Sequence, residues 1–218
     1  MNGASLYELA TEMISGLNMN SVLFYSYLNT SRVIHELKRY WRALRALDTS
    51  ATVGPSTSNI TRITLPTNWR RYLPPRTMLG GSLLSPVQLV DSSGNVCFHL
   101  SEISMMEVQG RLGGSGLFAV DVANNQLVIV GIWDRTYTVH QHYQLNPGDI
   151  TASVGWTPFT EDTYSRMLLH DAVAMYELGV DYDDQNARMG NANFVAAQRI
   201  SSQMVAWDDG LTLASLGQ

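Results

Sequence analysis

The spacing of apolar residues changes along this chain, from a helical period at both ends to a strand period in the middle. In the first part, apolar residues recur every three or four positions, as in amphipathic helices. A polar stretch of small residues, 48–59 (DTSATVGPSTSN), predicts a linker, and residues 60–65 beyond it alternate like a strand. Helical spacing returns after the turn Asn146-Pro-Gly-Asp149. The pattern therefore predicts helices, then strands, then helices.

Two helices are expected before the linker. Ser5 and Glu8 fit a capping box at the start of the first, and Ser21 is the expected N-cap of the second. We expect the second helix to continue to about Ala46. The residues expected on its apolar stripe are Phe24, Tyr27, Leu28, Ile34, Leu37, Trp41 and Leu44.

The middle of the chain is expected to form hairpins. Residues 87–90 and 96–100 flank one turn, and residues 117–122 and 127–132 flank another. Residues 137–145 give the clearest strand pattern. One face is expected to carry Tyr137, Val139, Tyr143 and Leu145, and the other Thr138, His140, His142 and Gln144.

After the turn at 146–149, Thr160 is the expected N-cap of a helix, and a second helix is expected from 187 to 207. The predicted fold class is α+β, an α-helical bundle built from N- and C-terminal helices with an inserted antiparallel β module. The bundle takes residues 1–50 and 150–207, the module takes 60–146, and a C-terminal tail takes 208–218.

The net charge of −5 is unevenly distributed. Residues 1–110 hold 9 Lys/Arg and 7 Asp/Glu, whereas residues 111–218 hold 5 and 12. DNA-reading proteins need a basic surface that neutralises phosphates, so the acidic half disfavours sequence-specific DNA binding. No apolar run approaches the roughly 18 residues of a membrane span, and no signal peptide is expected. Cys97 is the only cysteine, which excludes an intramolecular disulfide.

Of the 14 basic residues, all but Lys38 are arginines, which favours protein interfaces, although codon bias gives the same skew. The tryptophans at helix ends, Trp41, Trp156 and Trp207, are expected to fill the core rather than bind a ligand. The run Trp69-Arg-Arg-Tyr72 fits an interface, a base-stacking site or a strand start packed on the β module. The candidate interface residues are Arg39, Arg42, Trp69, Arg70, Arg71, His140 and His142.

His140 and His142 are alternate strand residues and are the best candidates for sharing a metal ion. A third ligand is required, for which His99 or a carboxylate is available, and the alternative is a pair of solvent or interface histidines. Residues 181–186 (DYDDQN) lack the glycine and glutamate of a calcium loop. Residues 110–116 are glycine-rich without the Gly-Lys-Ser/Thr of a phosphate loop. No catalytic constellation is found, so we expect no enzyme activity and no cofactor.

The order of these segments resembles the head-to-tail adaptor (connector) proteins of tailed bacteriophages. The resemblance lies in a long early helix (YLNTSRVIHELKRYWRAL), a Leu-Pro motif beside an aromatic residue (ITLPTNWRRYL), a hairpin-rich middle, and the segment WTPFTEDTYSRMLLHDAVAMYELG followed by a helix to Trp207. It covers most of the chain. The β module is large for the simplest adaptors, and its size is closer to the adaptors of short-tailed phages.

This resemblance implies a homo-oligomeric ring, commonly of twelve subunits, in the virion neck between capsid and tail. Such a ring binds the portal protein, receives the tail proteins and lets double-stranded DNA pass non-specifically; the subunits assemble in the host cytoplasm, and no membrane is involved. A terminal tail that clasps the portal is also implied. Trp207, Leu211, Leu213 and Leu216 are its candidate anchors, the leucines being expected along one face of an extended segment.

Two alternatives remain open at the level of sequence. The first is a tail nozzle or fibre-attachment protein that binds through its β module. The second is a metal-dependent enzyme that uses His140 and His142.

Overall fold

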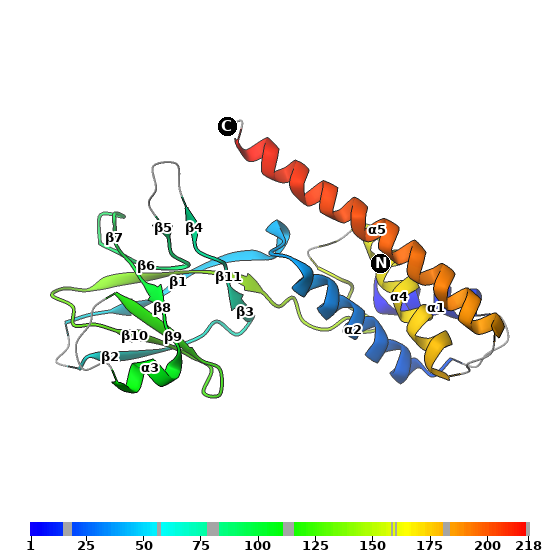
Figure 1. The fold of residues 1–218 in the computed structure, drawn as a ribbon, viewed down its shortest axis with the longest axis horizontal. Helices are drawn as coiled ribbons and strands as arrows, with labels where there is room; N and C mark the ends of the chain where they lie inside the picture. The colour runs from blue at the N-terminus through cyan, green and yellow to red at the C-terminus, as the bar shows by residue number, and fades with distance from the viewer. Residues whose placement is uncertain are drawn as a thin grey trace. The chain divides into compact units, whose positions relative to one another are not determined.

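The computed structural model of the chain divides into two units (Figure 1). One comprises Met1–Leu44 and Pro147–Gln218, and the other comprises Arg45–Asn146. The structure describes residues 1–14, 19–55, 58–77, 83–110, 116–157, 159, 161–180 and 184–216.

The helical unit contains α1 (Gly3–Met13), α2 (Ser21–Lys38), the short 3-10 turn η1 (Arg42–Leu44), α4 (Asp162–Val180) and α5 (Asp184–Leu216). Helix α4 packs against α5, α2 and α1, and it lies between α2 and α5 in Figure 1. It is accordingly the most buried helix. Its fully buried side chains are Met167, Leu168, Ala172, Val173 and Ala174.

Asparagines cap the first two helices, so the predicted caps Ser5 and Ser21 are wrong. Asn2 Oδ1 accepts from the backbone N–H of Ser5 at 3.0 Å, and Asn20 Oδ1 accepts from Val22 at 2.9 Å. An asparagine ahead of the first turn satisfies the orphan N–H groups as well as serine does. Thr160 lies outside the described residues.

Helix α2 ends at Lys38, so the predicted continuation to Ala46 is wrong. The backbone is extended at Arg39 (φ −154°, ψ 171°), and the Trp41 indole folds back to donate to the His35 carbonyl at 2.8 Å. A side chain therefore satisfies a carbonyl at the helix end. The residues that follow, predicted as helix end and linker, form strand β1 (Arg45–Val53).

The second unit holds eleven strands and one short helix among its described residues. Helix α3 spans Met105–Gly110. The strands are β1, β2 (Ile60–Thr64), β3 (Trp69–Tyr72), β4 (Arg76–Thr77), β5 (Leu83–Leu84), β6 (Val87–Val90), β7 (Val96–His99), β8 (Ser101–Glu102), β9 (Leu117–Asp121), β10 (Gln126–Val130) and β11 (Tyr137–Leu145).

These strands form two larger sheets and a two-stranded pair. The first has the order β1-β11-β6-β7, with β3 also paired to β11, and the second has the order β2-β10-β9-β8. Both predicted hairpins are confirmed as β6–β7 and β9–β10. In their turns, Gly94 (φ 85°) and Asn125 (φ 52°) take the left-handed conformation that these residue types tolerate.

Both larger sheets contribute side chains to one apolar core. Its fully buried members include Leu89 and Val139 from the first sheet and Phe118, Leu127 and Ile129 from the second. The other face of the second sheet packs against α3, with Ala119, Val128 and Val130 meeting Val108. Strands β9 and β10 are therefore covered on both faces, which explains the nearly continuous apolar run in β10.

The predicted fold class, an α-helical bundle with an inserted antiparallel β module, is wrong. The described chain is a strand-rich α+β protein with nine strands in two sheets. One of the sheets is mixed, because β8 runs parallel to β9. The short strand β8 and the polar strand β1 carry too little alternation to predict from the sequence.

The C-terminal segment also differs from its prediction. Helix α5 continues to Leu216, so residues 208–216 are helical rather than extended. Leu211, Leu213 and Leu216 therefore do not alternate along a strand-like tail. No helix in the described ranges combines the length and the apolar character that crossing a membrane requires.

Candidate interaction surfaces

Two of the three Arg, Lys and Glu side chains of α2 lie on the inner face of the helix. Arg32 and Glu36 are 2% and 0% exposed, and Arg32 Nη1 lies 3.1 Å from Glu36 Oε2. Arg32 Nη2 reaches Asp149 Oδ1 at 2.8 Å. The Trp156 indole donates to Glu36 Oε1 at 2.9 Å. A buried charge is costly unless it is paired, and these partners keep both side chains inside.

A second polar group joins α2 to α4. His35 Nε2 lies 2.6 Å from Asp171 Oδ2, and Ser31 Oγ donates to the same oxygen at 2.9 Å. Lys38 Nζ is 3.2 Å from His35 Nδ1. An ammonium only donates, so Nδ1 accepts and Nε2–H donates to the carboxylate. This arrangement satisfies the buried polar groups of Ser31, His35 and Asp171 at the contact between α2 and α4.

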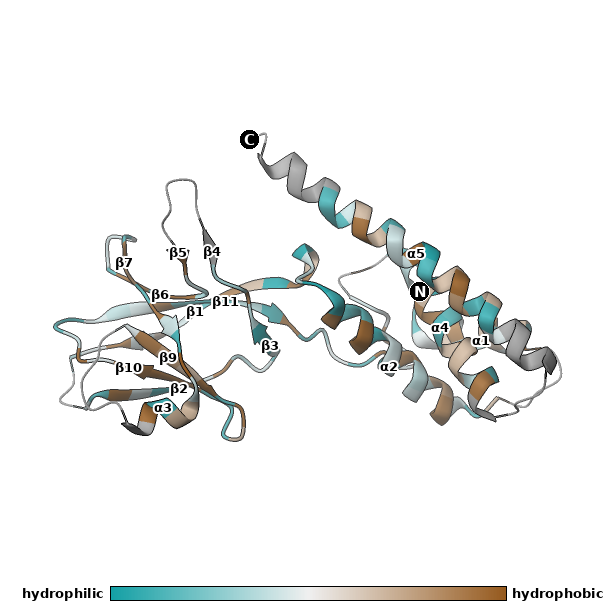
Figure 2. Ribbon diagram, in the orientation of Figure 1, coloured by the Kyte–Doolittle hydropathy of each residue, from teal (hydrophilic) through white to brown (hydrophobic). Residues whose placement is uncertain are grey.

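The outer face of α2 is nearly uncharged. Val22, Ile34 and Leu37 are 77%, 45% and 46% exposed, and Lys38 is the one exposed Arg, Lys or Glu of this fully described helix. Apolar and polar residues are mixed along the ribbon of α2 in Figure 2. A surface helix normally turns its charges outward. The first half of α2 buries Phe24 and Leu28, whereas its second half buries Arg32 and Glu36 and so has the reverse polarity.

A shallow groove of ≈ 560 Å³ runs along this outer face. Its lining is mainly uncharged and consists of Val22, Tyr25, Ser26, Asn29, Thr30, Val33, Ile34 and Asp149. We call the exposed residues Val22, Ile34 and Leu37 with this groove the α2 face.

Helix α5 carries a second exposed apolar patch. Phe194 and Val195 are adjacent and are 45% and 65% exposed. Between residues 190 and 209, Arg199 and Asp209 are the exposed charges. Because α4 packs against both helices, the outer sides of α2 and α5 point away from α4 in different directions. The unit therefore presents two weakly charged helix surfaces. We call Phe194 and Val195 the α5 patch.

Arg39 and Arg42, predicted at an interface, join α5 to the segment that follows α2. Arg39 Nη2 lies 3.0 Å from Asp208 Oδ2 and 2.7 Å from Asp209 Oδ1. Its guanidinium also stacks 5.2 Å from the Trp41 ring. The backbone N–H of Arg42 donates to the buried Asp208 Oδ1 at 2.8 Å. These contacts lie within the helical unit.

The predicted anchor Trp207 belongs to an aromatic cluster of the helical unit. Its ring lies 5.7 Å from Tyr164 and 6.3 Å from Phe159. Phe159 in turn contacts Trp41 and Trp156. Trp41 and Trp156 are 1% and 2% exposed, which confirms the prediction that they fill the core.

Strand β3 carries the predicted run Trp69, Arg70 and Arg71 beside β11. Arg71 Nε donates to Gln144 Oε1 at 2.7 Å, and Arg70 Nη2 donates to Asn146 Oδ1 at 2.7 Å. The Trp69 ring lies 5.6 Å from that of Tyr72. The run therefore makes contacts inside the β unit, as the strand-start interpretation predicts.

His140 and His142 share the outer face of the five-stranded sheet, as their spacing predicts. His140 is opposite Gln88, which is in turn opposite His99. His99 is thus two strands from His140, about 10 Å at the usual strand spacing, too far to share one ion. Within the described ranges, no group of three His, Cys, Asp or Glu residues has the geometry to hold a metal.

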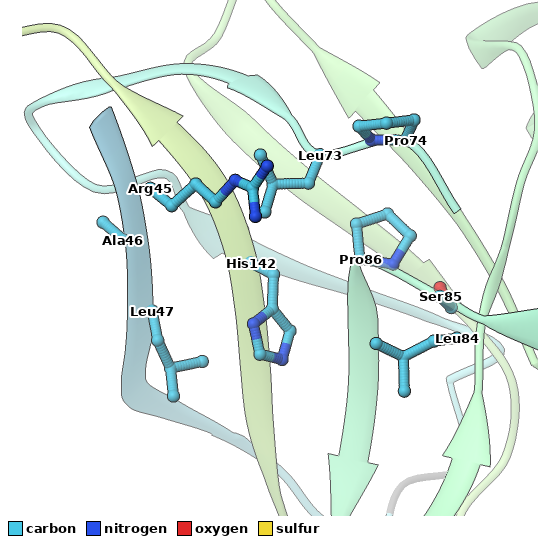
Figure 3. A pocket seen from close by; sticks show the side chains of 9 residues that line it. All are labelled: Arg45, Ala46, Leu47, Leu73, Pro74, Leu84, Ser85, Pro86 and His142. Carbon is cyan, nitrogen blue, oxygen red and sulfur yellow. The ribbon is translucent and has the colours of Figure 1, made fainter. Parts of the chain in front are cut away.

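A pocket of ≈ 370 Å³ opens on this face (Figure 3). It lies over His142 of β11, between β1 and the segment that leads into β6. Burial, and secondly the charge of His140, lower the pKa of His142. The lining residues are Arg45, Ala46, Leu47, Leu73, Pro74, Leu84, Ser85, Pro86 and His142.

Sequence reasoning missed both the inward polar groups of α2 and this pocket. Arg32 and Glu36 follow Phe24 and Leu28 at four-residue spacing, so the sequence places all four residues on the same face of the helix. The helix expected to continue to about Ala46 includes Arg45, whereas the structure places Arg45 in β1, where it lines the pocket with His142. The sequence matches no family model, and no curated protein sequence matches it significantly.

Proposed function

We propose that this chain is a structural subunit of a head-to-tail adaptor ring in a tailed bacteriophage. In this role it binds beneath the portal in the virion neck, receives tail proteins and lets DNA pass. The proposal starts from the order of segments in the sequence. The observation that carries it furthest is the reversed polarity of α2, which buries Arg32 and Glu36 and exposes Val22, Ile34 and Leu37.

Reversed polarity favours a protein partner on the α2 face. Exposed apolar groups without charges around them are typical of surfaces that become buried on assembly. Buried Arg32 and Glu36 have their partners inside the subunit. The internal contacts of Arg32 and Glu36 therefore do not account for the uncharged outer face, whereas burial against a partner does.

A second copy of the chain fits this face. The α5 patch is a different surface of the same unit, and contact between two different surfaces is a heterologous interface, which closes into a ring when the rotation allows. Both surfaces are apolar and weakly charged, so contact between the α2 face of one subunit and the α5 patch of the next buries few charges.

The acidic balance also suits a channel through which DNA moves without binding. Phosphate contacts need Lys or Arg, and net negative charge repels the duplex. We assign no catalytic residue, metal or cofactor. Docking of the C-terminal part of α5, with Trp207, Leu211, Leu213 and Leu216, onto the portal belongs to the same proposal.

The experiment is electron microscopy of the purified protein, alone and mixed with the portal protein of the same phage. The proposal expects closed rings, coaxial with the portal in the mixture. Particles that remain single subunits in both samples would sink it. Cross-linking in the virion separates the adaptor from the tail-nozzle or fibre-attachment alternative, because only the adaptor links to the portal. The metal-dependent enzyme alternative predicts stoichiometric metal in elemental analysis.

A further inference from the structure

We propose that the pocket over His142 binds an acidic side chain flanked by aliphatic residues, supplied by an extended segment of a partner protein. The site belongs to the β unit alone. It does not depend on the ring or on the α2 face, so its failure would leave the proposed function standing.

The pocket walls are aliphatic on opposite sides of the imidazole. Figure 3 shows Leu47 on one side of His142 and Leu84 and Pro86 on the other. Leu47 is 51% exposed, so its side chain is accessible to a ligand. The volume of ≈ 370 Å³ is at the lower end of the range typical of ligand sites, about 300–1,000 Å³. A single short peptide segment matches these dimensions.

The charge of the lining favours an anion. Among the described residues that line the pocket, Arg45 carries a positive charge, His142 supplies two ring nitrogens, and none is Asp or Glu. In Figure 3 the Arg45 side chain reaches across β11 above the imidazole, so both groups border the same space. A guanidinium makes charge-assisted bonds with a carboxylate. The described part of the chain offers neither ring nitrogen of His142 a hydrogen-bond partner.

The backbone around the pocket favours a side-chain carboxylate over a chain terminus. Terminal carboxylates are commonly held by successive backbone N–H groups. Pro74 and Pro86 have no N–H. The N–H groups of Leu73 and His142 are already bonded, to the carbonyls of His142 and Pro86 at 3.1 and 2.7 Å. Recognition therefore falls to Arg45 and His142, with the aliphatic walls holding the flanking residues.

The test is a nuclear magnetic resonance titration of the full chain with blocked peptides. The probe is acetyl-Leu-Glu-Leu-amide, and its uncharged match is acetyl-Leu-Gln-Leu-amide. We expect the glutamate peptide to shift the His142 imidazole signals saturably, and the glutamine peptide to bind at least tenfold more weakly. Equal affinity of the two peptides, or no shift with either, would overturn the proposal.

Two variants and a third peptide complete the experiment. Arg45→Gln and His142→Gln should each weaken the glutamate peptide about tenfold, whereas Arg62→Gln, on β2 of the other sheet, is the matched control and should leave it unchanged. If Arg45→Gln fails to fold, the difference in affinity between the glutamate and glutamine peptides for the wild-type chain still tests the proposal. Tighter binding of acetyl-Leu-Gln-Leu with a free carboxyl end would refute the choice of a side chain over a terminus.

Discussion

His35 of α2 and Asp171 of α4 form a buried pair whose Nε2 and Oδ2 atoms lie 2.6 Å apart. Asp171→Ala leaves the imidazole N–H and the Ser31 hydroxyl without their acceptor. Leaving buried donors such as these unsatisfied costs about 1–3 kcal/mol. We therefore expect urea denaturation to show a loss of this order in the free energy of unfolding.

A double-mutant cycle separates the pair from simple loss of packing. His35→Leu combined with Asp171→Leu removes both polar groups, so the double variant should lose less stability than the sum of the single variants. Additive effects within about 0.5 kcal/mol would show that the two groups do not stabilise each other.

Asp208 is the buried acceptor that holds α5 to the segment after α2. Asp208→Ala removes the acceptor of the Arg42 backbone N–H and one partner of Arg39. Leaving a buried donor unsatisfied costs about 1–3 kcal/mol. We expect faster amide hydrogen exchange in the last turns of α5. Asp209→Ala, which removes only the exposed partner, is the control and should change the exchange rates little.

Glu177 of α4 makes the stability of the protein depend on pH. Burial raises its pKa, although the side chain of Asn193 donates to it. Because the folded-state pKa exceeds the unfolded-state value, ionisation lowers stability as the pH rises through the folded-state pKa. Glu177→Gln should therefore stabilise the protein at neutral pH and have little effect below the unfolded-state pKa of about 4.3.

Chemical denaturation of the wild type and of Glu177→Gln, at neutral pH and at a pH below about 4.3, measures this difference in the free energy of unfolding. Glu8→Gln, on the exposed side of α1, is the matched control. A gain for Glu177→Gln that is the same at both pH values would contradict a cost from ionisation.

The sequence predicted regular hairpins well and the orientation of α2 poorly. Strands β6, β7, β9 and β10 have alternation or continuous apolar runs beside turns with Gly94 or Asn125, so local signals define them. In α2 the expected stripe put Ile34 and Leu37 inside, yet both are exposed, while Arg32 and Glu36 are buried. An apolar stripe assumes that charges stay in water, and paired buried charges break that assumption.

Strand β1 shows a different limit. Its residues are mostly small and polar, and they become a strand because they pair with β11 over most of their length. Such pairing depends on a partner more than eighty residues later in the chain, so no local pattern predicts it. The same lack of a local signal hid the pocket between Arg45 and His142, because its lining converges from four separate segments.

The reversed polarity of α2 leads to one decisive comparison, the mass of the assembled particle with and without charges on the α2 face. Ile34→Glu combined with Leu37→Glu places two carboxylates on exposed positions, so folding should change little. Val122→Glu, at a 72% exposed position in the β unit, is the matched control. Mass photometry with portal protein present should find rings for the wild type and for Val122→Glu, and single subunits for the double variant. Rings of unchanged mass in the double variant would contradict the assignment of the α2 face to the contact between neighbours.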